Sequence, residues 1–166
     1  MESIEVFTDG SALKNGKADA TGGLGVFFGD ESPLNYSERL TPGGLKRRVT
    51  NNVAELLAIQ RAMEIFEKNF DKGKKILHLF TDSEYAFNIF TKWIVGWKRA
   101  GWRKKDGKPV ENQDIIQAIQ GKREEGGVRV IFHHCRSHRS EPNDKTSREY
   151  YVWHGNNAAD ILATQV

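Results

Sequence analysis

The sequence of 166 residues predicts a single mixed-sheet α/β domain spanning residues 1–166. Three β-rich segments near the N-terminus are separated by turns containing glycine or proline, as in an antiparallel meander. After residue 50, strand-like and helix-like patterns alternate, which is typical of parallel strands joined by helices. We therefore expect a five-stranded mixed sheet, with three antiparallel strands followed by parallel ones, flanked by helices.

The expected meander occupies the first quarter of the chain. Its first strand is predicted at 3–9 and ends at the turn dipeptide Asp9-Gly10. A polar, glycine-containing turn leads to a returning strand at 22–29, and a third strand at 35–40 is closed by the sequence Thr-Pro-Gly-Gly.

A long amphipathic helix is predicted after Thr50. Apolar residues recur there three and four positions apart, which places them on one helical face: Leu56, Ile59, Met63, Phe66 and Phe70. Thr50 and Asn51 are suited to cap its N-terminus.

The rest of the chain alternates between strands and helices. The strand expected at 74–82 is apolar on both faces and therefore belongs inside the sheet. The other expected elements are a short helix at 83–90, a basic helical segment, a helix at 111–127, a strand at 128–134, a polar stretch at 135–154 and a last short helix from Gly155.

Composition excludes several classes of protein. No apolar run reaches membrane-spanning length, so no membrane partner is expected. The first strand begins almost at Met1, which leaves no room for a signal or transit peptide. Cys135 is the single cysteine, so no disulfide framework is expected. These features predict an intracellular protein, cytoplasmic or nuclear, and we expect it to be a monomer.

The distribution of positive charge points to a polyanionic partner. The net charge of +3 is small, but residues 92–108 hold seven Lys/Arg against one Asp. Three of the four tryptophans lie in the same segment. A basic run alone is usually a solvated loop, whereas tryptophans interspersed with it favour nucleic-acid binding.

The tripeptide Phe-Thr-Asp occurs twice, each time at the end of an apolar strand, and delivers Asp9 and Asp82. If the two strands are parallel neighbours, both carboxylates emerge at the same edge of the sheet, where ligands of α/β proteins usually bind. Close carboxylates repel each other unless a cation lies between them, and all-oxygen ligands favour Mg²⁺ or Mn²⁺. Two such ions could activate water for cleavage of a phosphodiester.

Glu55 and Asp160 are further acidic candidates, and each of the four acids also has a purely structural interpretation. Asp9-Gly10 could form a turn, and Asp82-Ser83 could form a helix N-cap. Glu55 could provide a favourable charge near a helix N-terminus, and Asp160 could be a solvated helical residue. Only convergence of all four would distinguish a site from these alternatives.

Six motifs in order resemble those of the type 1 ribonuclease H family, and the resemblance covers essentially the whole chain. They are FTDGS (7–11), RVTNNVAEL (48–56), FTDSEY (80–85), WIVGWKRAGWRKKDGKPVENQD (93–114), SH (137–138) and GNNAAD (155–160). The resemblance implies the ribonuclease H-like fold. It also implies Mg²⁺-dependent endonucleolytic hydrolysis of the RNA strand of RNA–DNA hybrids, leaving 5′-phosphate and 3′-hydroxyl ends.

The resemblance also implies roles for individual residues. The four metal-binding, catalytic carboxylates resemble Asp9, Glu55, Asp82 and Asp160, and the mobile catalytic histidine resembles His138. A pocket for a DNA phosphate resembles Arg48, Thr50 and Asn112. Contacts to ribose 2′-hydroxyls resemble Asn15, Asn51 and Asn52, whose amides can both donate and accept. The aromatic contacts to the DNA strand resemble Trp93, Trp97 and Tyr85.

Some of these assignments have structural alternatives. Trp93 and Trp97 are spaced to face a core, Asn51 and Asn52 could be only caps, and Arg48 could be a solvated charge.

The interval between His138 and Asp160 is longer than is usual in the family and implies an enlarged loop. His134 or His154 could therefore be the functional histidine. The loop residues, expected at 139–154, could touch the hybrid or form a passive surface excursion. The neighbouring sequence HHCRSH does not favour zinc, because adjacent strand residues point to opposite faces.

Two other functions remain open at the level of the sequence. One is a module that binds hybrid or double-stranded RNA without cutting it, although all four acidic positions are filled. The other is the hybrid-degrading domain of a reverse transcriptase.

Overall fold

The computed structural model describes residues 1–166 and contains one five-stranded mixed sheet of order β3-β2-β1-β4-β5. The strands are β1 (Glu2–Leu13), β2 (Thr21–Phe27), β3 (Tyr36–Leu40), β4 (Lys75–Thr81) and β5 (Val130–His134). The first three are antiparallel, whereas β4 runs parallel to β1 and β5 parallel to β4. The predicted fold class is thus confirmed, and β4 lies inside the sheet as its two apolar faces indicated.

Strand β1 is longer than the sequence predicted. It does not end at Asp9 but continues to Leu13, because it keeps pairing with β2 after its pairing with β4 has stopped at Thr8. Asp9 lies opposite Gly25 within this antiparallel extension. The turn interpretation of Asp9-Gly10 is therefore wrong.

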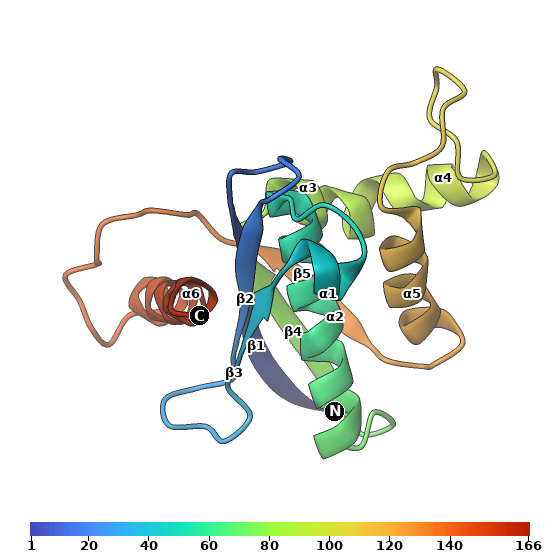
Figure 1. Cartoon of the computed structure of the whole chain (residues 1–166). Coiled ribbons are helices and arrows are strands. Elements are labelled where there is room, and N and C mark those ends of the chain that lie inside the picture. Colours follow the sequence, from blue (N-terminus) through green and yellow to red (C-terminus); the bar gives the residue numbers. More distant parts are fainter.

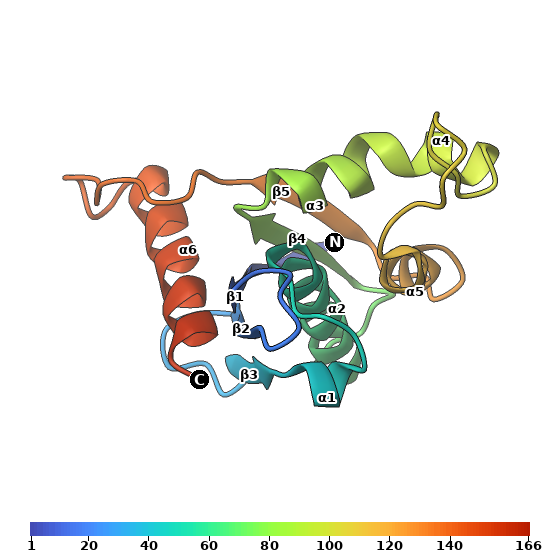
Figure 2. The ribbon, with the colours of Figure 1, turned by 45° about the horizontal axis from the view of Figure 1, so that its top comes forward.

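Helices cover both faces of the sheet (Figure 1). They are α1 (Pro42–Leu45), α2 (Asn51–Asn69), α3 (Glu84–Asn88), the π-helical turn η1 (Ile89–Trp93), α4 (Ile94–Arg99), α5 (Gln113–Glu124) and α6 (Arg148–Thr164). Helix α2 packs on one face with α5 beside it, and α6 packs alone on the other (Figures 1 and 2). Most of the hydrophobic core lies on the α2 side.

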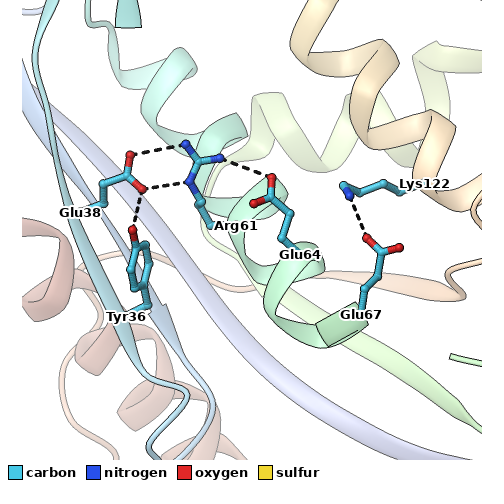
Figure 3. Close-up of polar contacts among 6 residues, drawn as sticks. All are labelled: Tyr36, Glu38, Arg61, Glu64, Glu67 and Lys122. Atoms are coloured by element: carbon cyan, nitrogen blue, oxygen red, sulfur yellow. Dashed lines mark hydrogen bonds and ion pairs between the residues drawn. The ribbon is translucent and has the colours of Figure 1, made fainter. Parts of the chain in front are cut away.

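Thr50 caps helix α2, as predicted: its hydroxyl accepts a hydrogen bond from the Val53 N–H at 3.0 Å. The edge strand β3 is tied to α2 by a polar cluster (Figure 3). Glu38 accepts hydrogen bonds from Tyr36 and Arg61, each at 2.9 Å. Arg61 also reaches Glu64, one turn further along α2.

Helix α6 begins earlier than the sequence predicted. Ser147 caps it by accepting from the Tyr150 N–H at 3.0 Å, so 148–154 are helical and the connection after β5 is only 135–147. This first part of α6 packs on the sheet through Tyr151, whose ring lies 5.6 Å from that of Phe7. The enlarged loop expected at 139–154 is therefore about half loop and half helix.

The basic, tryptophan-bearing segment is helical through η1 and α4 and then forms the projecting loop at 100–110 (Figure 2). Lys98 is neutralised by Glu124 at 2.6 Å. Four basic residues around the loop have no acidic partner within 4 Å: Arg99, Arg103, Lys105 and Lys108. None of the helices combines the length and apolarity that crossing a bilayer would require.

Candidate active site

Strands β1 and β4 bring the two Phe-Thr-Asp sequences side by side. Phe7 is paired with Phe80 and Thr8 with Thr81, so Asp9 and Asp82 follow the last pair at the same edge of the sheet. Ser83, and not Asp82, caps α3 by accepting from the Ala86 N–H at 3.0 Å. The N-cap expected at Asp82-Ser83 is thus formed by Ser83, which leaves the Asp82 carboxylate available to a ligand.

Glu55 reaches the same edge from helix α2, because Gly10 allows the helix to approach β1 closely. A Cβ atom on Gly10 would lie 2.4 Å from the Glu55 backbone nitrogen, so only glycine fits there. Glu55 lies past the first turn of α2 and is 7% exposed. It is not the solvated charge at a helix terminus that the alternative interpretation required.

One carboxylate oxygen from each of Asp9, Glu55 and Asp82 lies within 4.8 Å of the others. Asp160 approaches this cluster from the opposite face of the sheet, on α6. The close approach depends on Gly25, the partner of Asp9 in β2, because a Cβ there would lie 2.2 Å from the Ala159 carbonyl oxygen. The structure thus brings all four predicted carboxylates to one place from four different elements.

Burial and mutual repulsion change the acidity of this cluster. Burial, followed by the charges of Asp82 and Asp160, raises the pKa of Asp9 to about 9. Burial also raises the pKa of Glu55 well above its ordinary value, with Asp9 and Asp82 contributing repulsion. The Gly10 backbone N–H opposes both shifts, and no cationic side chain contributes to either one.

The cluster fits a divalent cation. The buried Oε1 atom of Glu55 has no hydrogen-bond partner, and leaving such an acceptor unsatisfied costs stability. A cation bound among the carboxylates would satisfy that atom and relieve the repulsion. The oxygen-only donor set suits Mg²⁺ or Mn²⁺ better than zinc.

His138 lies in the connection between β5 and α6, in a left-handed conformation with φ of 53°. It lines a cavity of about 640 Å³ together with Asp82 and His134, and a second, smaller cavity that also contains Asp160. His154 instead bonds Asp30 at 2.7 Å. Of the three candidate histidines, His134 and His138 therefore lie beside the carboxylates, and only His138 also lines the cavity that contains Asp160.

Two of the three residues expected to hold a DNA phosphate line one cavity of about 530 Å³, and the third, Arg48, is bonded to its wall. Thr50 and Asn112 line it together with Gly16, whose carbonyl oxygen accepts from Arg48 Nη1 at 3.1 Å. Asn112 has a left-handed backbone (φ 58°), and its amide donates to the Tyr85 hydroxyl at 3.2 Å. Tyr85 therefore supports the pocket, in addition to any contact of its own.

The three asparagines expected to contact ribose line the same cavity: Asn15, Asn51 and Asn52. Asn51 Oδ1 accepts from the Ala12 N–H, and Asn15 Oδ1 accepts from the Asn51 N–H, both at 2.8 Å. These bonds tie β1, the loop after it and α2 together, while the amide N–H groups have no hydrogen-bond partner within the protein. Asn51 therefore has a structural role, and its side-chain NH₂ group remains free to donate to a ligand.

The two tryptophans of the aromatic contact differ in burial. Trp93 is 41% exposed, whereas Trp97 is partly buried and packs against the main core. Their ring centroids lie 5.8 Å apart. The core interpretation thus holds in part for Trp97 but not for Trp93.

Sequence reasoning missed four residues beside the carboxylates: Arg136, Arg139, Trp153 and Asn156. Arg136 lies two positions before His138 and Arg139 one position after it, and this proximity to an expected site residue was the available signal. Trp153 and Asn156 could not be placed, because the early start of α6 was not anticipated.

The comparisons with known proteins agree with this geometry. A family model described as RNase H matches residues 1–166. The chain belongs to the RNase H family. It is 36% identical over 153 residues to ribonuclease H1 of Mus musculus, covering 89% of this chain and 50% of that protein. It is 34% identical over 146 residues to ribonuclease H of Nitratidesulfovibrio vulgaris, covering 87% and 84%. The chain thus spans about half the length of its mammalian RNase H relatives.

Solved RNase H structures share the fold. LC9-RNase H1, a type 1 RNase H with the type 2 active-site motif, superposes with a TM-score of 0.70 at 22% identity, covering 98% of this chain and 71% of that one. LC11-RNase H1, solved in complex with RNA/DNA hybrid, superposes with a TM-score of 0.57 at 20% identity, covering 98% and 95%. At these identities the likeness concerns the fold, and it confirms the fold class predicted from the motifs.

Proposed function

We propose that the protein is an endoribonuclease that hydrolyses the RNA strand of RNA–DNA hybrids with the help of two Mg²⁺ ions, leaving 5′-phosphate and 3′-hydroxyl ends. The observation that carries the proposal is the convergence of Asp9, Glu55 and Asp82 within 4.8 Å, without a neutralising cation from the protein. Membership of the RNase H family supports it, as does the neighbour solved with a hybrid.

The four carboxylates are the metal ligands in this proposal. Asp9 and Glu55 are buried, so they hold fixed positions, whereas Asp82 and Asp160 are half-buried and face solvent. Bound Mg²⁺ would lower the pKa of a water molecule and stabilise the charge on the leaving oxygen. Mn²⁺ has the same preference for oxygen ligands and is expected to substitute.

The cavity around Thr50 and Asn112 is proposed to hold a phosphate of the DNA strand, with Arg48 supplying positive charge. A guanidinium, a hydroxyl and an amide can bind a phosphate without reading sequence. The free amide groups of Asn15, Asn51 and Asn52 are suited to the 2′-hydroxyls that distinguish RNA from DNA. Trp93 offers exposed apolar surface to deoxyribose, with Trp97 behind it.

His138 is proposed to move a proton or to assist product release. Its position on a loop beside Asp82 and Asp160, with an exposed ring, supports that role. His134 lines the larger cavity as well and is the alternative. Exchange of each histidine for alanine distinguishes them, since only the functional one lowers the rate of turnover.

An end-labelled hybrid incubated with and without Mg²⁺ tests the proposed activity. Cleavage confined to the RNA strand and dependent on Mg²⁺ is expected, with duplex RNA and duplex DNA left intact as controls. Binding of the hybrid without cleavage would support the non-catalytic module instead. Equal cutting of duplex RNA would contradict the proposed specificity.

A further inference from the structure

Two arginines beside the carboxylates have no role in the function proposed so far. Arg136 and Arg139 flank His138, and both line the cavity of about 640 Å³ that contains Asp82. Both also line the smaller cavity that contains Asp82 and Asp160. They are the only Lys or Arg side chains that line these two cavities.

The charge of this arginine pair is largely free. Arg136 has no acidic group within 4 Å, and Arg139 has only a long ion pair with Glu149 at 3.9 Å. Both partners of that pair are well exposed, so the pair contributes little. By contrast, Arg148 at the start of α6 is held by Glu5 at 2.6 Å. Arg136 and Arg139 thus remain available to an anion from outside the protein.

The backbone of each arginine is tied to α6, the helix that carries Asp160. The Trp153 indole N–H donates to the Arg139 carbonyl oxygen at 3.0 Å, and the Asn156 amide donates to that of Arg136 at 3.5 Å. The two bonds anchor the backbone of both arginines relative to the carboxylates, although the pair lies on a loop and its guanidinium groups are exposed. A pre-positioned pair of this kind is suited to binding one part of a large substrate.

The location favours an anion that belongs to a larger molecule. A small free anion would be repelled by the four carboxylates nearby, whereas a nucleic-acid strand is also held by its other contacts. The connection 135–147 leads to α6, on the face of the sheet opposite α2 and the proposed DNA-phosphate cavity (Figures 1 and 2). The arginine pair therefore shares a cavity with Asp82 and Asp160, on the side of the carboxylates away from the proposed DNA-phosphate cavity, where a strand with its scissile phosphate at the carboxylates can continue.

We propose that Arg136 and Arg139 form a second phosphate-binding site, which holds a backbone phosphate of the RNA strand next to the cut. The inference rests on the proposed function, since it needs an RNA strand at the carboxylates. Each guanidinium can donate two parallel hydrogen bonds to a phosphate, which fixes the orientation of the strand as well as its position. The arginine pair would thus position the scissile bond over the carboxylates without contacting the reacting atoms.

Binding of hybrid to Arg136→Ala/Arg139→Ala tests this directly. Measurements are made in an Asp9→Asn background, so that the hybrid stays intact. The matched control is Lys74→Ala/Lys145→Ala, which also removes two charges: Lys145 is exposed in the same connection, and Lys74 precedes β4 at the opposite end of the sheet. The arginine variant is expected to bind about tenfold more weakly and to reduce the salt slope by about one phosphate contact, whereas the control loses much less. Arg→Lys exchanges should restore part of the loss.

A neutral linkage in the RNA identifies the phosphate. The position of the cut is first mapped with the wild-type protein. A single uncharged methylphosphonate then replaces each phosphate around that position in turn. The ribose next to it carries a 2′-O-methyl group. One position should weaken binding with intact arginines but cause no further loss in the arginine variant, because the two changes remove the same contact. Additive losses at every position, or a loss no larger than that of the control, would overturn the proposal.

The two levels of the proposal fail differently. If the wild-type protein does not cut hybrid, the proposed function is wrong. If it cuts hybrid while the arginine variant binds and cuts like the control, only the second phosphate site is wrong.

Discussion

Helix α2 carries acidic residues in two contrasting environments. At its start, Glu55 is buried against other carboxylates, and its Oε1 has no hydrogen-bond partner. Further along, Glu64 and Glu67 each have a cationic partner, Arg61 and Lys122 respectively. Figure 3 shows these pairs, together with the contact from Arg61 to Glu38 in β3.

The difference shows that glutamates of α2 outside the acidic cluster are paired with Lys or Arg side chains of the protein. Arg61 lies between two glutamates, and Lys122 reaches across from α5. No cationic side chain forms an ion pair with Asp9 or Glu55, although these two carboxyl groups are more deeply buried. Buried carboxylates without a cationic partner destabilise the metal-free protein. We therefore expect a bound metal ion to supply the positive charge that pairs with them.

The largest expected effect is the loss of hybrid cleavage when the acidic cluster is altered. Asp9→Asn removes the central carboxylate while keeping its shape. Hybrid cleavage should fall by at least about 100-fold, the loss that even an outer-shell partner of a metal site can cause. Arg61→Ala, at the paired end of α2, should leave the rate unchanged. Initial cleavage rates at saturating hybrid check both, and persistent activity in Asp9→Asn would mean that the metal site is placed wrongly.

The next effect concerns pH and stability without metal. The pKa of Asp9 is raised to about 9 and that of Glu55 is also raised, so the folded protein keeps protons that the unfolded chain releases above about pH 4. Between about pH 4 and pH 9, the free energy of unfolding of the metal-free protein should therefore be highest at the acidic end and should fall as the pH rises. The slope is up to about 1.4 kcal/mol per pH unit for each group.

Denaturant unfolding in the presence of a chelator, repeated across this pH range, measures that slope. Asp9→Asn removes one titrating group and should flatten the curve and stabilise the folded state at neutral pH. A stability that rises through the same range would contradict the raised pKa values.

Arg61→Ala tests the paired end of α2. The side chains of Arg61 and Glu38 are 26% and 24% exposed, so their ion pair is partly shielded from solvent. Its loss also frees β3 from α2. We expect a destabilisation of about 1 kcal/mol, or about 2–4 °C in Tm for a chain of this size. Thermal unfolding measures it, and a change as large as that of a core substitution would mean that Arg61 has a further role.

Lys122→Ala should have the smallest effect. Glu67 keeps a second partner in Lys72 at 3.7 Å, so its charge remains partly balanced after the exchange. We expect a loss below about 0.5 kcal/mol, as for ordinary surface pairs. The same thermal unfolding series gives the value, and a loss equal to that of Arg61→Ala would show that the α2–α5 contact matters more than its geometry suggests.

Features that depend on local patterns were predicted best from the sequence. The repeated tripeptide Phe-Thr-Asp predicted that Asp9 and Asp82 lie together, because neighbouring parallel strands bring equivalent positions into register. It could not predict that β1 continues past Asp9, since that depends on pairing with β2. Asp160 was predicted from the family motif, but its approach to Asp9 depends on the fit of α6 against Gly25.

The start of α6 could not be read from the sequence, and the arginine pair was missed with it. The first turns of α6 are stabilised by contacts with the distant residues Phe7 and Glu5, and not by an apolar stripe. Residues 148–154 have their apolar side chains in one continuous run, Tyr-Tyr-Val-Trp, and not at helical spacing. Without that helix, the proximity of Arg136 and Arg139 to His138 in the sequence does not by itself show that they lie beside the carboxylates.

The effect of Mg²⁺ on Tm near pH 8 is the most direct test of the acidic cluster as a cation site. Binding to the folded state alone must raise Tm, and near pH 8 the ion has to displace fewer protons from Asp9 and Glu55 than at lower pH. Mg²⁺ should raise the Tm of the wild-type protein and of Arg61→Ala alike, and should have little effect on Asp9→Asn. An equal rise in all three, or no rise in the wild-type protein, would contradict a metal site formed by these carboxylates.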